Sequence, residues 1–463
     1  MGSVGSGSRE SQESSKSVME ARLSHRGGQP VAHPARPAEC PARHPKRGTL
    51  LAMELPKRGL DRETLRATMC ERKAQDADWH AARTFSLVYP ANDEVDAILA
   101  DANEMYLYEN ALNPLRFPSL RQMEVEVVSI TKGLLHGPEE ADGCMTSGGT
   151  ESIIMAVKAA RERARAERGV TEPTLVAPVS AHPAFGKAAH YLGLEHIQVP
   201  LGDDYRADVA AAARLLDERT ALLVGSAPNY PFGTADPIPE LAALAADRGI
   251  SFHTDACLGG FMLPFYERLG EPVPPFDFRV PGVTTISADV HKYGYATKGA
   301  SVVLHRDGDH LKSYQRFLYD RWPGGLYLSF AMAGARPAAP IAAAWAILNY
   351  LGEEGYVELA GQVRDAVRAF RGGIEAIPEL EVVGDPVMSV FAFRAGEGSG
   401  VDTFAVGDAM DDKGWCLDRQ HGPDALHLML SPKHLTVADA FLADLRDAVA
   451  HHGPSRGKEA RYS

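Results

Sequence analysis

The sequence predicts an α/β fold, with a large domain built on a mostly parallel sheet and a smaller α+β domain at the C-terminus. From about residue 140, short apolar runs with the length of buried strands alternate with helical patterns. Such alternation is typical of parallel sheets that are covered by helices on both faces. After about residue 335 the pattern changes to one long helical stretch followed by strand-like segments, which indicates the second domain.

The expected elements of the large domain alternate along the chain. Buried strands are expected at residues 174–179, 195–200, 221–226, 250–256, 284–289 and 300–305. Helices are expected at residues 151–167, 182–193, 206–218 and 238–249. In the C-terminal part we expect a long helix at 338–377, strands within 380–395 and 425–431, and a closing helix at 436–452. Ligands of parallel sheets bind at the carboxyl ends of the strands, so the residues that follow these strands are candidates for a site.

Composition divides the remaining chain. The first 50 residues are rich in Gly, Ser, Pro, Arg and His and contain too few apolar groups to offset the entropy lost on ordering. In chain order we therefore expect a disordered leader (1–50), an N-terminal helical segment (51–125), the large α/β domain (126–335), the small α+β domain (336–455) and a tail (456–463).

Charge and cysteine content exclude several classes of protein. Lys and Arg total 48 against 61 for Asp and Glu, and the net charge of −13 argues against a nucleic-acid binder or a binder of anionic membranes. The five cysteines form no CxxC pair and no metal-ligand spacing, so a reducing compartment is expected. No apolar run approaches the ~20 residues of a membrane span, and the N-terminus lacks the apolar core of a secretory signal. We expect a soluble cytoplasmic protein without a metal site.

The first candidate motif is TSGGTES at residues 146–152. Gly148, Gly149 and Thr150 open an amphipathic helix, so free backbone N–H groups and the positive end of the helix face whatever lies in front. This arrangement binds phosphate. The alternative is an ordinary Ser/Thr-capped helix that follows a glycine turn.

Two further candidates stand at the ends of predicted strands. Asp255, in HTDACLGG, ends a buried strand, where a carboxylate is costly unless it is paired. It could hold the protonated ring nitrogen of a heterocyclic cofactor, with an attraction of about 4 kcal/mol at ~4 Å and an effective dielectric of ~20. His182, in AHPAF, could lie flat against an aromatic cofactor. The alternatives are a helix-capping Asp255 and a hydrogen-bonded structural His182.

Lys292 completes this set of candidates. It stands in SADVHKYGYATKG, among small, polar and aromatic residues that suit an enclosed site. Burial should favour its neutral form, and a neutral amine can form a Schiff base with an aldehyde. A phosphate cradle, a ring-nitrogen partner, a stacking histidine and such a lysine, in this order along an α/β domain, together indicate pyridoxal 5'-phosphate (PLP).

Residues from about 85 to 450 also resemble the sphingosine-1-phosphate lyases. The resemblance rests on these stretches: FPSLRQMEVEVV (117–128), TSGGTESI, HTDACLGGF, FDFRVPGVTTISADVHKYGYATKG (276–299) and GGLYLSFAMAGARP (324–337). It implies the PLP-dependent transferase fold of type I, similar to aspartate aminotransferase and shared with the group II decarboxylases. The membrane anchor of eukaryotic members is not seen, so the chain resembles the soluble bacterial branch.

The resemblance implies a role for each matching residue. Lys292 matches the lysine that holds the cofactor, Asp255 the ring-nitrogen partner and His182 the stacking histidine. The surroundings of the cofactor phosphate correspond to Gly148, Gly149, Thr150 and His291. The surroundings of the substrate's phosphate and hydroxyl correspond to Tyr89, Asn110, Tyr230 and Lys298. Gly325 and Ser329 correspond to a segment that the partner lends to the site in the family's homodimers.

Three positions depart from the family's pattern. Asn113 stands where the family has a histidine near the substrate phosphate, because the usual N-P-L-H-P reads NALNP here. Thr297 and Phe330 each replace a proline. These changes leave the cofactor chemistry intact and bear on the identity of the substrate.

The implied reaction is retro-aldol cleavage of a phosphorylated long-chain base to a fatty aldehyde and phosphoethanolamine. Tyr230, Lys298 and the freed Lys292 are the candidate proton carriers. The alternatives are a core aromatic for Tyr230 and a surface cation for Lys298. Rival functions are a PLP-dependent amino-acid decarboxylase, a lyase of another β-hydroxy amine, and a PLP-binding protein without turnover.

Overall fold

The computed structural model describes residues 55–113 and 115–457, which belong to two units, Met1–Asp76 and Ala77–Ser463. In the first unit the described part contains helix α2 (Arg62–Lys73). Asp61 caps this helix, since its carboxylate accepts the backbone N–H of Thr64 at 2.9 Å. The predicted leader (1–50) and residues 458–463 of the predicted tail lie outside the described residues.

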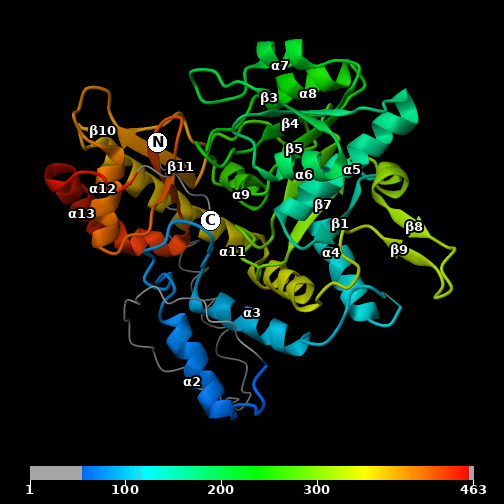
Figure 1. Cartoon of the computed structure of the whole chain (residues 1–463), viewed down its shortest axis with the longest axis horizontal. Helices are drawn as coiled ribbons and strands as arrows, with labels where there is room; N and C mark the ends of the chain where they lie inside the picture. Colours follow the sequence, from blue (N-terminus) through cyan, green and yellow to red (C-terminus); the bar gives the residue numbers. More distant parts are fainter. Residues whose placement is uncertain (1–54, 114, 458–463) are drawn as a thin grey trace, which may run out of the picture. The chain divides into compact units, whose positions relative to one another are not determined.

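The second unit contains a seven-stranded sheet in the order β1-β7-β6-β5-β4-β2-β3 (Figure 1). The strands are β1 (Asp142–Thr146), β2 (Thr174–Pro178), β3 (Glu195–Val199), β4 (Thr220–Ser226), β5 (Ser251–Asp255), β6 (Thr285–Ala288) and β7 (Ser301–His305). Strands β2 to β6 run parallel, whereas β7 is antiparallel to both β6 and β1. The mostly parallel sheet and its strands from β2 to β7 are confirmed. Strand β1 was not predicted, because DGCMT contains no apolar run.

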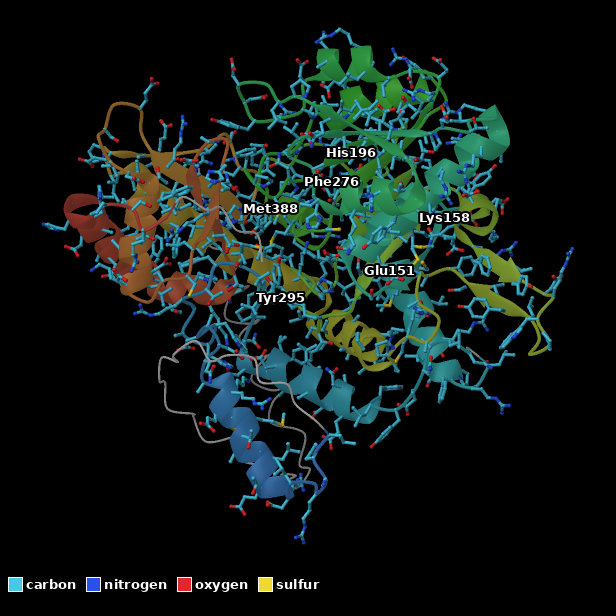
Figure 2. All side chains as sticks on the ribbon, in the orientation of Figure 1. Glu151, Lys158, His196, Phe276, Tyr295 and Met388 are labelled. Atoms are coloured by element: carbon cyan, nitrogen blue, oxygen red, sulfur yellow. The ribbon has the colours of Figure 1, made fainter. Side chains whose placement is uncertain are left out.

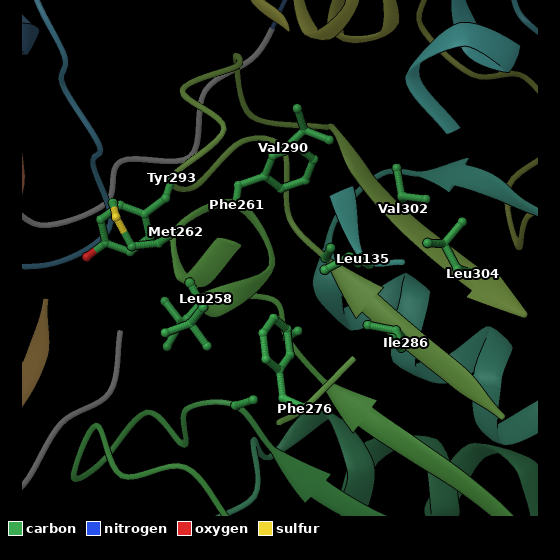
Figure 3. Packing of buried hydrophobic residues seen from close by; sticks show 14 of the residues in the cluster. Leu135, Leu258, Phe261, Met262, Phe276, Ile286, Val290, Tyr293, Val302 and Leu304 are labelled. Carbon is green, nitrogen blue, oxygen red and sulfur yellow. The ribbon is translucent and has the colours of Figure 1, made fainter. Parts of the chain in front are cut away.

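Helices cover both faces of this sheet, as predicted. They include α5 (Gly149–Arg168), α6 (Ala184–Leu192), α7 (Val209–Leu215), α8 (Ile238–Ala246) and α9 (Leu263–Arg268). Leu222 and Val224 of β4 pack in one cluster with α5 and α6, and Leu223 between them packs in another with α7 and α8. Neighbouring strand residues thus enter different cores, which explains why the strands read as continuous apolar runs. Figure 3 shows the larger core, where Ile286 and Phe276 are buried.

The C-terminal part forms a second, antiparallel sheet in the order β10-β11-β13-β12. Its strands are β10 (Leu380–Val382), β11 (Val390–Ala395), β12 (Asp418–Gln420) and β13 (Ala425–Met429), and its helices are α12 (Thr403–Asp412) and α13 (Ala438–His451). A separate core around the fully buried Trp415 and Phe441 holds this sheet to its helices. The predicted small α+β architecture is confirmed.

Long helices join these parts of the second unit. They are α3 (Asp93–Met105), α4 (Pro118–Leu134) and α11 (Ala339–Glu375), and α11 is interrupted at Gly352, whose φ is 55°. Helix α4 spans the predicted boundary between residues 125 and 126. The short elements are α10 (Gly308–His310), the hairpin β8 (Phe317–Tyr319) and β9 (Tyr327–Ser329), the 3-10 helices η1 (Gly259–Phe261) and η3 (Pro432–Val437), and the π-helix η2 (Leu311–Gln315). Across residues 55–113 and 115–457, no helix combines the length and apolar character that a bilayer span requires.

Candidate active site

A cavity of about 420 Å³ lies where several parallel strands end and helix α5 begins. Ser226 and Asp255 are the last residues of β4 and β5, and Asp289 follows β6 directly. The cavity is lined by Ser147, Gly148, Gly149, Thr150, Glu151, Ile153, His182, Ser226, Pro228, Tyr230, Asp255, Cys257, Leu258, Asp289, His291 and Lys292. Both the predicted sheet edge and most of the predicted cofactor residues therefore come together in one place.

One wall of the cavity is the start of α5. Gly148 precedes the helix with φ of +156°, a conformation that side chains disfavour. A Cβ on Gly149 would lie 2.8 Å from Asp289 Oδ2 and from Cys257 Sγ, so only glycine fits there. The first N–H groups of a helix have no acceptor within it and favour an anion in front.

Glu151, labelled in Figure 2, connects this wall to the chain that follows β9 through hydrogen bonds. It is buried, and its Oε2 accepts the backbone N–H of Ser147 at 2.7 Å. Its Oε1 accepts the backbone N–H groups of Met332 at 2.7 Å and Ala333 at 3.3 Å. The glycine turn and the segment beyond the β8–β9 hairpin are thereby held in one position.

Lys292 is paired with Asp289 at the floor of the cavity. The Lys292 ammonium lies 3.0 Å from Asp289 Oδ2, and the two side chains are 21% and 2% exposed. Burial alone would lower the pKa of Lys292, but Asp289, followed by weaker neighbours, outweighs burial and holds this pKa well above its usual value. The expectation that burial keeps this amine neutral is therefore wrong, because the Asp289 carboxylate lies beside it.

Asp255 and His182 stand opposite the glycine turn. Asp255 Oδ1 accepts the backbone N–H of Cys257 at 3.1 Å and the hydroxyl of Ser287 at 3.2 Å, while its carboxylate lines the cavity. His182 Nδ1 accepts the backbone N–H of Ala184 at 3.1 Å, which leaves the ring proton on Nε2. Burial lowers the pKa of His182, so its ring is neutral near pH 7.

His291 lies beside the Lys292–Asp289 pair. Its Nδ1 accepts the backbone N–H of Ala300 at 3.1 Å, and its Nε2 is 3.7 Å from Asp289 Oδ2. Burial lowers the pKa of His291 to about 4, so the ring is uncharged at neutral pH. Its Cε1 would lie 3.2 Å from a Cβ on Gly148, which places the imidazole against the glycine turn.

The predicted proton carriers occupy different surroundings. Tyr230 lines the cavity, and its hydroxyl donates to Asp418 Oδ2 at 2.8 Å. The Lys298 ammonium donates to the His291 carbonyl at 3.1 Å and lies 4.4 Å from the centre of the Tyr89 ring. Although the Lys298 side chain reaches solvent, protein around the ammonium and the second charge on Lys292 lower its pKa to about 8.

Six predicted residues do not line this cavity: Tyr89, Lys298, Asn110, Asn113, Gly325 and Ser329. Asn110 Oδ1 accepts the backbone N–H groups of Leu112 and Arg336, so it braces a loop. Asn113 is exposed, and its Oδ1 accepts the backbone N–H of Leu115 at 3.0 Å. Gly325 lies in the exposed turn of the β8–β9 hairpin, and Ser329 ends β9 with its hydroxyl donating to the Ala331 carbonyl at 2.9 Å. To take their predicted roles, these residues would have to contact a ligand outside this cavity or the site of a partner subunit.

Sequence reasoning missed several residues of the cavity. Asp289 is the most consequential, and the signal for it was present: it follows a predicted strand in the same way that Asp255 ends one. Glu151 and Cys257 stand inside motifs that were recognised, but nothing in their spacing indicated that they face the cavity. Ser226 ends a strand, yet serine there carries no charge that would have marked it.

Comparison with known proteins shows the family to which this chain is similar. Residues 70–396 match the family described as the pyridoxal-dependent decarboxylase conserved domain. A sphingosine-1-phosphate lyase of Arabidopsis thaliana is 42% identical over 87% of this chain and 75% of its own length. Sphingosine-1-phosphate lyase 1 of Rattus norvegicus is 42% identical over 85% of this chain and 69% of its own. The solved structure of a sphingosine-1-phosphate lyase from Burkholderia pseudomallei K96243 superposes with a TM-score of 0.83 at 40% identity, covering 87% and 93% of the two chains.

Proposed function

This chain belongs to the pyridoxal-dependent decarboxylase family and, within it, to the sphingosine-1-phosphate lyases, and we propose its function on that basis. It is a PLP-dependent carbon–carbon lyase that cleaves a phosphorylated long-chain base to a fatty aldehyde and phosphoethanolamine. The observation that carries the proposal is the cavity itself, where an amine, three carboxylates and a helix N-terminus converge.

The cavity residues fit PLP. The open N–H groups at Gly149 and Thr150, in a wall where no Cβ fits at Gly149, suit a phosphate group. None of the hydrogen bonds among the described residues involves Asp255 Oδ2, so this oxygen can accept a ring N–H. Lys292 supplies the amine for the aldehyde, and the neutral ring of His182 is suited to stack on a pyridine.

PLP, when bound, takes up the electron pair released as the substrate's Cα–Cβ bond breaks. The chain's own residues hold and protonate the reacting atoms. Asp289 keeps the proton of Lys292 close to the floor of the cavity. We propose that the Tyr230 hydroxyl, which donates to Asp418 in the absence of substrate, exchanges a proton with the substrate's β-hydroxyl.

The substrate's phosphate requires positive charge near Lys292. We propose that Lys298 supplies it together with Tyr89, because the Lys298 ammonium has no carboxylate within salt-bridge distance among the described residues. Asn113, which stands where the family has a histidine, is exposed and does not line the cavity. Asn113→His should therefore tighten binding of the phosphorylated base only if the substrate phosphate reaches this loop.

We also propose a homodimer in which the β8–β9 hairpin of each subunit covers the other. An isolated two-stranded hairpin is marginal in water, and exposed apolar patches mark interaction surfaces. The hairpin projects from its unit (Figure 1), and six of its apolar side chains are 40% to 67% exposed: Phe317, Leu318, Tyr319, Trp322, Leu326 and Leu328. Gly325 and Ser329 would then reach the partner's site. Sedimentation of the wild type and of Trp322→Asp tests this, since the substitution should shift the dimer toward monomer.

A reducing, cytoplasmic location is part of the same proposal. Cys70, Cys144, Cys257 and Cys416 are all free thiols, and Cys257 lies in the cavity itself. An oxidising compartment would not preserve them.

Product analysis tests the proposed reaction. The purified chain, loaded with PLP, is incubated with dihydrosphingosine 1-phosphate; a fatty aldehyde and phosphoethanolamine in equal amounts are expected. Lys292→Ala should reduce turnover at least ~1000-fold and abolish borohydride labelling, whereas Lys312→Ala, at a surface ion pair, should leave both intact. Carbon dioxide from amino acids would indicate a decarboxylase instead, and bound PLP without any turnover would indicate a binding protein.

A further inference from the structure

A line of buried polar side chains runs behind Asp255, on the side away from the cavity. Strands β5 and β6 pair in parallel, with His253 opposite Thr285 and Asp255 opposite Ser287. Alternate residues of a strand face the same side of the sheet, so these four side chains lie in one row. All four are buried, and His253 and Ser287 are fully so.

Hydrogen bonds connect the row from end to end. His253 Nδ1 lies 2.9 Å from Thr285 Oγ1, and His253 Nε2 lies 3.0 Å from Ser287 Oγ. The Ser287 hydroxyl then donates to Asp255 Oδ1 at 3.2 Å. A buried polar chain of this kind is costly unless every member is satisfied, so its presence in the core requires a reason.

The direction of each hydrogen bond follows from the chemistry of its end. A carboxylate only accepts, so the Ser287 proton must point to Asp255. Ser287 Oγ can then only accept from His253, which must carry its proton on Nε2 and accept from the Thr285 hydroxyl at Nδ1. The Cys257 thiol, 3.3 Å away, also donates to Ser287 Oγ and completes its capacity. Every proton in the row therefore points toward Asp255.

The imidazole in this row is uncharged at neutral pH. Burial lowers the pKa of His253 to about 4, although the nearby Asp255 opposes the shift. Because the imidazole is neutral, it places no positive charge on the side of Asp255 that faces away from the cavity, and the carboxylate keeps its negative charge. Meanwhile Oδ1 is held by both Ser287 and the Cys257 backbone N–H, so the carboxylate cannot rotate without losing two donors.

We propose that His253 and Ser287 are positioning residues that fix the Asp255 carboxylate and direct its Oδ2 toward the pyridine nitrogen of PLP. The proposal rests on the proposed cofactor role of Asp255. Neither residue touches the cavity, and both act through that carboxylate. The neutral His253 donates to Ser287 and so orients the Ser287 hydroxyl, which in turn donates to Asp255.

Cofactor release from the full-length holoenzyme tests this assignment. PLP-loaded protein is diluted into buffer without PLP, and the loss of bound-cofactor absorbance is followed. Ser287→Ala and His253→Leu should release PLP about tenfold faster, the effect of one lost hydrogen bond to a charged group. His253→Gln, whose amide can donate from nearly the same place as Nε2, should stay within about threefold of wild type. Ser251→Ala is the matched control, since this buried serine at the other end of β5 contacts Arg163 and not Asp255.

A spectrum separates positioning from a loss of packing. The absorbance of bound PLP depends on whether its ring nitrogen is protonated, so Ser287→Ala should change the spectrum while Ser251→Ala should not. Release of PLP from Ser287→Ala at the wild-type rate would overturn the inference. So would equal acceleration by His253→Leu and His253→Gln; if the leucine variant does not fold, Ser287→Ala decides alone. A wild-type protein that retains no PLP would instead refute the proposed function before any variant is compared.

Discussion

Replacing Asp289 with Asn removes the charge that keeps Lys292 protonated. The carboxylate is 2% exposed and lies 3.0 Å from the ammonium, and the amide of Asn has nearly the same shape. The cavity should therefore keep its form, while the net shift in the pKa of Lys292 should change from upward to downward. Burial favours the neutral amine, and the attraction to Asp289 that mainly opposes it would be lost. The pKa of Lys292 should therefore fall.

The distance sets the size of this effect. Two unit charges at 3.0 Å in an effective dielectric of ~20 attract by about 5 to 6 kcal/mol. Each ~1.4 kcal/mol changes the ratio of neutral to protonated amine tenfold. An ordinary lysine at pH 8 is neutral in roughly one molecule of 250, and Lys292 in fewer, because its pKa is raised. Losing only a quarter of the attraction would therefore increase the neutral fraction about tenfold.

The rate of PLP uptake by the cofactor-free protein measures this fraction, because only the neutral amine attacks the aldehyde. At pH 8 Asp289→Asn should take up PLP at least ~10-fold faster than wild type. Its rate should also level off at a lower pH, whereas the wild-type rate should keep rising through pH 10. The matched control is Asp309→Asn, which breaks a pair of the same spacing with Lys312 at 3.2 Å on the surface. Such exposed pairs contribute little, so uptake should not change.

Identical pH profiles for Asp289→Asn and wild type would refute this reasoning. They would mean that Asp289 does not set the charge of Lys292, and that the remaining neighbours hold the proton. A slower uptake by the variant at every pH would refute it as well, since it would show that the carboxylate assists the attack.

Three further predictions follow from contacts in and around the cavity. Gly149→Ala places a Cβ 2.8 Å from Asp289 Oδ2 and should release PLP about tenfold faster, whereas Gly361→Ala, in open space on α11, should stabilise the fold by ~0.5–1 kcal/mol. Tyr230→Phe removes the hydroxyl that donates at 2.8 Å and should reduce kcat about a hundredfold with a small change in Tm. Affinity for the phosphorylated base should fall as the pH rises through about 8, because Lys298 then loses its positive charge, and Lys298→Arg should remove this dependence.

Each of these has a clear contrary result. Wild-type PLP retention in Gly149→Ala would show that the helix start can shift, and so does not shape the cavity. An unchanged kcat in Tyr230→Phe would exclude its hydroxyl from proton transfer. An affinity that stays constant between pH 7 and 9 would mean that Lys298 does not bind the phosphate; inhibition by inorganic phosphate over the same range provides the control.

The order of strands and helices, and the position of the reactive residues along them, can be read from the sequence alone. Periodicity is a local property, so the strands from β2 to β7 and helices such as α5 could be read within one or two residues of their ends. Asp255 and Lys292 could be found because a charged residue beside a buried strand is rare enough to carry information. Strand β1 was not predicted, because an edge strand with one partner needs fewer apolar residues.

How these residues act on one another depends on distances that are set by the fold. Whether Lys292 is neutral or charged depends on burial against attraction, and the carboxylate of Asp289 at 3.0 Å favours the charged form. The row from His253 to Asp255 exists because β5 and β6 pair in one register, and a shift of one residue would break it. Asn113 likewise stands in a family motif yet turns its amide to its own backbone. Distances between residues far apart in sequence set these energies, and no local pattern contains them.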